Sequence, residues 1–463
     1  MKSLIKKTNI PLLFALMGII CVYCYWIDNA KCIVPYSDFF RWVLDYGERI
    51  QKGNGMVSFF FADGSQHYQP GIYLLSFSLL QVTHYNFSIL PIAGMIVKVI
   101  VCILVIVLFI SVCHPSKVNL YIGTIFISLI TLNFNQWEII TEPFAFASAI
   151  RIGLLIGVFW LTAYIFSDNK MKNNCRKYVI VIIGALICDL FIITMCGGYA
   201  FAVAFSLILN ILIFVLNSVD KNSYVHAAIF IVLILVGIFI YMQLVSSGSN
   251  QFEFSLENLI AIFAGFFMFW GASVLPTSIE NKEGVFEIYS IVGAGIVIIM
   301  LLLFLMCLFR SLKEKNKKYL FIMLLITYAN ALGFSISLAR VPEYGISVMV
   351  SSRYVIDSAI GLIACAFGVE FIISVCKKKT SNIKIGEILV CCLCVLLAAT
   401  NFIEGCNSVY IGQFYKNVET QLENIEECSD EFLQSISATD AETTRKSLYF
   451  MKENKLSLSL IHI

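Results

Sequence analysis

Charged side chains suited to chemistry follow directly after the first apolar stretch of the chain. Asp38, Arg41, Asp45 and Arg49 recur every three or four residues, which predicts one face of an amphipathic helix lying on a membrane surface. A carboxylate at such a boundary is tuned by partial burial and a nearby arginine, so Asp38 is a candidate general base and Arg41 a candidate substrate contact. A surface helix with internal salt bridges explains the pattern equally well.

Two further polar segments carry candidate binding residues. In the first, Asp63 to Pro70, His67 and Tyr68 have side chains that bond a phosphate or a hydroxyl, although a simple turn accounts for the same residues. The second places amides, a carboxylate and an indole together, a combination that suits carbohydrate; its candidates are Gln136, Trp137 and Glu138. A tryptophan at the membrane interface beside helix-start carboxylates, such as Glu142, is the alternative.

Arginines on the predicted loop 340–353 break the usual bias of basic residues toward the cytoplasm. Arg340 and Arg353 suit bidentate capture of phosphate, and Tyr354 suits the interface. Anchors whose charged ends reach back to the surface are the alternative explanation. Of the local patterns in the chain, this one points most specifically to a ligand.

Charged residues also occur inside apolar segments: Lys98, Arg151 and Asp189. Charges at this depth are costly and usually face a cavity or a partner, so each is a functional candidate. Arg151 lies about eight residues, or roughly 12 Å, below the expected outer surface. We expect a cavity that opens outward to hold all three. The alternative is that Asp189 merely pairs with a neighbouring cation.

The composition fixes the class of protein around these residues. Of 463 residues, 59% are hydrophobic and 13% are charged, whereas soluble domains have about 45–50% and 25%. The mean hydropathy is +0.86, so the chain is expected to be an all-α, polytopic membrane bundle. A net charge of +2 gives no indication of nucleic-acid binding. Most of the 16 cysteines lie in apolar runs and show no metal-ligand spacing, so no metal site is expected.

Hydropathy predicts eleven membrane-spanning helices, with thirteen as the main alternative. The predicted spans are 10–27, 88–112, 118–134, 143–166, 178–196, 199–217, 225–245, 287–309, 319–339, 354–376 and 385–402. Segments 70–84 and 256–275 are expected to be interfacial or re-entrant. Basic clusters then place the N-terminus in the cytoplasm and the C-terminus outside the plasma membrane.

The organisation that follows is a membrane domain, 1–402, and an extracytoplasmic helical tail, 403–463. The outer loops are expected at 28–69, 135–142, 246–286 and 340–353. The tail has ten acidic and five basic side chains. Its residues Phe414, Val418, Leu422 and Ile425 recur at helical spacing, and the segment from Thr439 to Glu442 predicts a capping box. Whether Cys406 and Cys428 form a disulfide is left open by the sequence.

The order of these features resembles the GT-C superfamily of membrane glycosyltransferases, which use sugars linked to polyprenyl phosphate. Asp38 stands in the first outer loop, like the catalytic acid of that superfamily. The run ending Gln136-Trp137-Glu138 is similar to a Gln-Trp-Glu-Asn pattern of bacterial cell-surface polysaccharide proteins, with Ile139 in place of the Asn. Arg353-Tyr354 looks like the Arg-Tyr pair of such enzymes. The tail is similar to their helical appendage in Arg445, Leu448 and Leu456.

The resemblance implies transfer of a sugar from a polyprenyl-phosphate donor to a glycan or lipid-linked acceptor, with Asp38 as base and Arg353 at the lipid phosphate. Arg340 and Arg151 are further candidates for that phosphate. Because the first loop lacks adjacent carboxylates or Asp-x-Asp, a metal-independent mechanism without a cofactor is expected. The partners would be membrane lipid, the lipid-linked sugar, the acceptor and other polysaccharide-assembly proteins. A flippase or transporter, a glycan polymerase and a non-catalytic scaffold are the alternatives.

Overall fold

The computed structural model describes residues 10–47, 49, 52–53, 68–167, 174–216, 221–245, 255–278, 285–314, 316–376 and 383–456. Every regular element in this part of the chain is helical. The long helices are α2 (Ile10–Ala30), α6 (Ile89–Cys113), α7 (Lys117–Thr131), α9 (Ala145–Ser167), α10 (Asn174–Phe191), α11 (Ala200–Leu216), α12 (Lys221–Leu244), α14 (Phe286–Ser311), α15 (Lys317–Tyr344), α16 (Val355–Cys376) and α17 (Ile383–Cys406).

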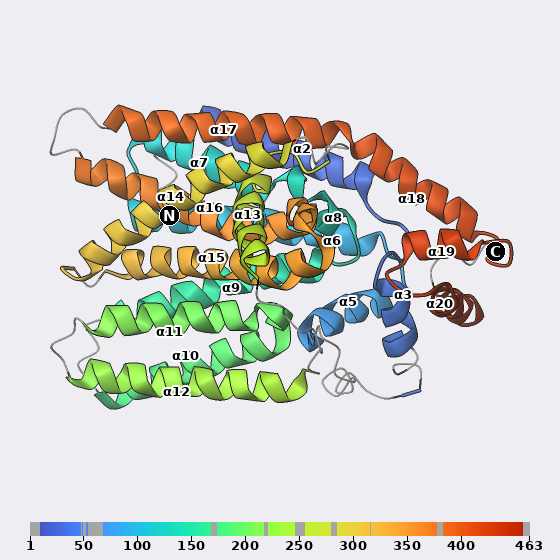
Figure 1. Cartoon of the computed structure of the whole chain (residues 1–463), viewed down its shortest axis with the longest axis horizontal. Helices are drawn as coiled ribbons and strands as arrows, with labels where there is room; N and C mark the ends of the chain where they lie inside the picture. Colours follow the sequence, from blue (N-terminus) through green and yellow to red (C-terminus); the bar gives the residue numbers. More distant parts are fainter. Residues whose placement is uncertain are drawn as a thin grey trace.

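The shorter elements gather mainly at one end of this bundle, on the right of Figure 1. They are α3 (Phe39–Trp42), the π-helical turn η1 (Val43–Gly47), α5 (Pro70–Val82), the 3₁₀ turn η3 (Phe134–Gln136), α8 (Trp137–Thr141), α13 (Leu256–Ala272) and the 3₁₀ turns η7 (Ile346–Val350) and η8 (Ser352–Tyr354). The tail forms α18 (Ser408–Leu422), α19 (Asp430–Ile436) and α20 (Ala441–Glu453).

Nine helical stretches among the described residues are long and apolar enough to cross a membrane. One of them, Cys175–Leu216, is 42 residues long and contains both α10 and α11. The chain reverses between the two at a π-helical turn η4 (Ile192–Cys196) and a 3₁₀ turn η5 (Gly197–Tyr199), where Gly197 has φ +55°, and both helices pack on α12. Each segment predicted to span is helical, which is compatible with a multi-pass membrane protein.

The outward faces of the long helices carry large apolar side chains. Examples on four different helices are Phe14, Ile100, Phe239 and Ile291, all exposed. Patches of this extent are rare on soluble proteins and suit contact with lipid tails. The apolar surface thus agrees with the class inferred from composition.

The two ambiguous apolar segments form the helices α5 and α13, which are shorter than most of the long ones. Helix α5 has 13 residues, with Pro70 at its first position, and α13 has 17. At 1.5 Å per residue, α5 is only about 20 Å long, less than the hydrocarbon thickness of about 30 Å. Helix α13 is drawn across the direction of the long helices in Figure 1 and packs against α14 and α15. Its contact with α14 requires glycine, because a Cβ at Gly271 or Gly293 would meet the backbone of the other helix.

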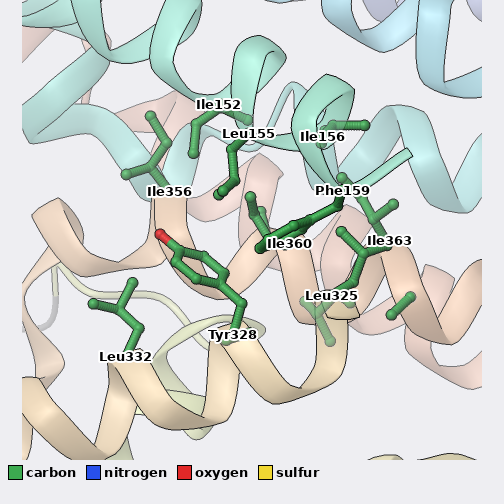
Figure 2. Close-up of a cluster of buried hydrophobic side chains, with 14 of the residues drawn as sticks. Ile152, Leu155, Ile156, Phe159, Leu325, Tyr328, Leu332, Ile356, Ile360 and Ile363 are labelled. Atoms are coloured by element: carbon green, nitrogen blue, oxygen red, sulfur yellow. The ribbon is translucent and has the colours of Figure 1, made fainter. Parts of the chain in front are cut away.

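The centre of the bundle is an apolar core between three helices. Figure 2 shows Ile152, Leu155, Ile156 and Phe159 of α9 facing Leu325, Tyr328 and Leu332 of α15 and Ile356, Ile360 and Ile363 of α16. These side chains are at most 6% exposed. Arg151 directly precedes this core on α9 and Asp357 lies within it on α16, so the core fixes the relative position of both charges.

The tail packs against the segment that follows α2. A second apolar cluster joins Leu433 and Leu448 of the tail to Phe39 of α3 and Phe77 of α5. The backbone N–H of Ser37, a residue with φ +57°, donates to the carbonyl oxygen of Ile436 at 2.9 Å. The tail therefore helps to hold the backbone beside Asp38.

Several local expectations need correction. Residues 39–47 form one continuous helical stretch, in which α3 is followed directly by η1. Its residues Phe39, Phe40 and Val43 are fully buried in protein, so this stretch does not lie free on a membrane surface. The predicted open loop 135–142 is instead a compact helical turn.

In the tail, α18 ends at Leu422, before Ile425. The last helix begins one residue later than predicted: Asp440 is its N-cap and accepts from the N–H of Thr443 at 2.7 Å. Both Cys406 and Cys428 are free thiols, which answers the question left open by the sequence.

Candidate functional site

A polar cavity of about 190 Å³ lies where α3, α5, the connection from α8 to α9, the end of α15 and the start of α16 meet. Its lining contains four carboxylates and four guanidinium groups. The carboxylates are Asp38, Glu138, Glu142 and Asp357, and the guanidinium groups are Arg41, Arg151, Arg340 and Arg353. Uncharged lining residues include Trp42, Gln69, Tyr73, Ser148, Tyr199 and Tyr354. The formal charges of the four carboxylates and the four guanidinium groups balance, so the cavity is strongly polar without a net charge.

One side of the cavity is organised by Glu138. Its carboxylate accepts hydrogen bonds from the hydroxyls of Ser351 at 3.0 Å and Ser352 at 3.1 Å and forms an ion pair with Arg353. The N–H of Glu138 in turn donates to the Ser352 hydroxyl at 3.2 Å. The Arg353 side chain remains about half exposed, so Glu138 orients it while leaving it accessible to a ligand.

Deeper in the cavity, Arg151 and Asp357 form a buried ion pair. The Nη2 atom of Arg151 donates to Oδ1 of Asp357 at 2.8 Å, and the guanidinium lies 4.5 Å from the centre of the Tyr199 ring. The Nε atom of Arg151 and the Oδ2 atom of Asp357 have no hydrogen-bond partner among the described residues. The pair is therefore incompletely satisfied, although both side chains are at most 8% exposed.

Asp38 lies at the outer rim of the cavity, partly exposed. It occupies the N-cap position of α3, yet its carboxylate accepts no capping hydrogen bond. Oδ1 lies 4.0 Å from Nη2 of Arg41, a distance at which the two side chains attract but are not locked together. The Asp38 carboxylate is thus held neither by a helix cap nor by a close ion pair.

Glu142 is a second buried carboxylate of the cavity, at 5% exposure. It lies in the bend between α8 and α9, and the described residues provide no hydrogen bond to its carboxylate. Burial raises the pKa of Glu142 well above its ordinary value, the charge of Glu138 raises it further, and Arg353 lowers it in part. A carboxyl group in this setting holds its proton to a higher pH than Asp or Glu in water.

We expect replacement of Glu142 with Gln to stabilise the protein increasingly as the pH rises. Because the pKa of Glu142 is raised in the folded state, folded wild-type protein binds the proton more tightly than unfolded protein. The wild-type protein is therefore most stable at a pH below the pKa that Glu142 has in the unfolded protein. It loses stability as the pH rises toward the pKa that Glu142 has in the folded protein. A tenfold difference in proton affinity corresponds to about 1.4 kcal/mol. Melting temperatures of both proteins, measured in detergent between pH 4 and 9, test this.

Glu453→Gln, at an exposed carboxylate in α20, serves as the control for that comparison. Its melting temperature should run parallel to that of the wild type across the same pH range. A Glu142→Gln variant that also runs parallel to the wild type would contradict the assignment of a raised pKa to Glu142.

The structure brings most of the sequence-predicted residues into this one cavity. Asp38, Arg41, Glu138, Arg151, Arg340, Arg353 and Tyr354 all line it. Three others do not. Gln136 is fully buried and accepts from Lys98, Tyr68 is buried outside the lining, and Trp137 lines a second cavity. His67 lies outside the described residues.

The expectation that one cavity holds all three intramembrane charges is wrong, since only Arg151 lines it. Lys98 is buried and donates a hydrogen bond to the side-chain oxygen of Gln136. Asp189 lies on α10 facing Gly237 of α12, and its Oδ1 atom has no hydrogen-bond partner among the described residues. Among the described residues no cation forms an ion pair with Asp189. The alternative, that Asp189 merely pairs with a neighbouring cation, is therefore not met in this part of the chain.

Two charged residues of the cavity were missed by reasoning from the sequence. Asp357 lies within the predicted span 354–376, so the rule that singled out Arg151 applied to it equally. Glu142 was assigned only to a helix start, where a carboxylate is favourable. Nothing in the local sequence indicates that Glu142 is buried against Glu138 and Arg353.

No family model, curated protein or solved structure matches this chain. The arguments about function below therefore depend on the residues and their geometry.

Proposed function

We propose that the chain is a GT-C-like membrane glycosyltransferase that moves a sugar from a polyprenyl-phosphate donor to a glycan or lipid-linked acceptor. The observation that carries the proposal is the convergence of Asp38 and four arginines on one cavity at the end of an apolar helical bundle. Such a place lets the lipid part of a donor stay in the membrane while its phosphate meets guanidinium groups. The site is proposed to face the outside of the plasma membrane.

In the proposed reaction, the Asp38 carboxylate accepts the proton of an acceptor hydroxyl as that oxygen attacks the anomeric carbon. The bond from the anomeric carbon to the phosphate oxygen breaks, and polyprenyl phosphate leaves with the electron pair. Arg353 and Arg340 stabilise the negative charge that grows on the departing phosphate. These two guanidinium groups supply positive charge within the chain, whereas the charge of Arg151 is balanced by Asp357, so we propose a mechanism that is independent of metal ions and cofactors.

The decisive experiment is incubation of the purified protein with polyprenyl-phosphate sugars and candidate acceptors. Release of polyprenyl phosphate together with a glycosylated acceptor supports transfer, and a ladder of lengthened products identifies a polymerase. Movement of the lipid-linked sugar across vesicles without turnover identifies a flippase. The clustering of charge at one end of the bundle favours chemistry there over passage through the membrane.

We expect Arg353→Ala to lower the rate of transfer by about 10²–10³-fold, the cost of removing one donor that stabilises developing negative charge. Loss of its charge leaves the departing phosphate less stabilised, and Glu138 loses its ion-pair partner. The measurement is the rate of polyprenyl-phosphate release at saturating donor. Arg310→Ala, at the end of α14, is a matched control that should keep the wild-type rate. Unchanged turnover in Arg353→Ala would exclude its proposed role.

A further inference from the structure

A second cavity, of about 540 Å³, lies beside the first, between the segment after α2 and the junction of α17 with α18. Its lining residues are Tyr36, Trp137, Ser278, Asn407, Tyr410, Ile411, Phe414 and Tyr415. The volume falls within the 300–1,000 Å³ typical of small-molecule sites, whereas the charged cavity of about 190 Å³ is smaller than that range. Two substrates would therefore need more room than the charged cavity offers.

The chemistry of the second cavity points to a neutral ligand. Five of its eight lining residues are aromatic, and none is charged. Tyr36 meets Phe414 and Tyr415 edge to face, with ring centroids 5.8 and 5.6 Å apart, which fixes the rings that form one wall. Asn407 donates to the hydroxyl of Ser278 at 2.6 Å, so an amide and a hydroxyl stand together among the rings.

The two cavities share walls built from the same short segments. Tyr36 lines the aromatic cavity and is followed at once by Ser37 and Asp38, which line the charged one. In the same way, Trp137 lines the aromatic cavity and the next residue, Glu138, lines the charged one. Burial, with the charges of Glu142 and Glu138, raises the pKa of Tyr36 to about 12, so its hydroxyl stays protonated as a donor at neutral pH.

We propose that the aromatic cavity is the subsite for a neutral sugar residue of the acceptor glycan, and this inference rests on the proposed function. The carbon-bound hydrogens of a sugar ring pack on aromatic faces, while its hydroxyls bond amide and hydroxyl groups. Asn407 and Ser278 bond each other, but an isoprenoid chain offers no hydrogen bond to the capacity that they keep beyond this contact or to the tyrosine hydroxyls, which a sugar would supply. Tyr36 and Asp38 are two positions apart, so an acceptor held in this cavity lies close to the proposed base.

The test is glycan binding to the full-length protein in phosphatidylcholine nanodiscs, measured by saturation-transfer NMR and by titration calorimetry. The probes are neutral oligosaccharides of hexoses and N-acetylhexosamines, with hexuronic-acid oligosaccharides of the same length for comparison. We expect a neutral oligosaccharide to bind. Tyr410→Ala should weaken that binding about tenfold, which corresponds to about 1.4 kcal/mol. Tyr410 is 72% exposed, so its removal leaves the fold intact.

Val409→Ala is the matched control, because Val409 is exposed on the same helix but does not line the cavity. It should bind glycan like the wild type, as should Arg353→Ala, which is expected to lose turnover only. Absence of neutral-glycan binding, preference for acidic glycans, unchanged binding in Tyr410→Ala, or displacement of the glycan by a polyprenol would each overturn the subsite. Glycan binding without any sugar transfer would instead support the subsite and overturn the proposed glycosyltransferase function.

Discussion

Asp38→Asn is expected to lower sugar transfer by about 10²–10⁴-fold, the range that a positioned general base contributes. The amide keeps the size of the side chain but cannot accept the proton of the acceptor hydroxyl. Because Asp38 is partly exposed and its carboxylate caps no helix, the substitution should leave the fold unchanged. The measurement is the steady-state rate of transfer at saturating donor, accompanied by the melting temperature.

The control for Asp38 is Asp45→Asn, at an exposed carboxylate in η1 that does not line the cavity. It should transfer sugar at the wild-type rate. If Asp38→Asn turns over like Asp45→Asn while Glu142→Gln is inactive, the base would be Glu142 and not Asp38. Such a result would keep the cavity as the proposed site of the reaction but would assign the role of general base to Glu142.

Asp357→Ala is expected to destabilise the protein by about 3–5 kcal/mol, because it leaves the Arg151 guanidinium buried without its counter-charge. The pair joins α9 to α16 beside the central core, so its loss loosens the contact between these helices. Reversible unfolding in mixed micelles gives the free energy. The double variant Arg151→Met with Asp357→Leu should recover most of the stability lost in Asp357→Ala, since apolar residues of similar volume replace a buried ion pair at little cost.

Asp189→Leu provides a matched comparison for a single buried carboxylate. The Asp189 Oδ1 atom has no hydrogen-bond partner among the described residues, so its removal should be neutral or stabilising. If Asp357→Ala costs no more than Asp189→Leu, the ion pair with Arg151 does not stabilise the fold. Arg151 has two proposed roles, stabilising the fold through its ion pair and supplying a positive charge to the cavity. The double variant separates them, because it is expected to fold yet to lack one guanidinium group in the cavity.

The tail connects the fold to the site in a way that its acidic composition does not show. Ile436 accepts from the backbone of Ser37, next to Asp38, and α18 supplies Phe414 and Tyr415 to the aromatic cavity. The sequence predicted only a helical appendage, whereas in the structure the tail forms part of the wall of the cavity proposed to bind the acceptor. Its apolar positions at helical spacing were sufficient to predict helices but not the surface on which they dock.

What the sequence alone determined is the class of the protein, the helical nature of each apolar segment and most of the charged residues of the cavity. These follow from local properties, since hydropathy over about twenty residues decides whether a helix suits lipid, and a charge within such a segment is costly wherever it lies. Only the tertiary structure decided which charges meet. Arg151 and Asp357 are 206 positions apart, and Glu138 and Arg353 are 215 apart. Such pairings depend on how helices pack across the bundle, which no local pattern specifies.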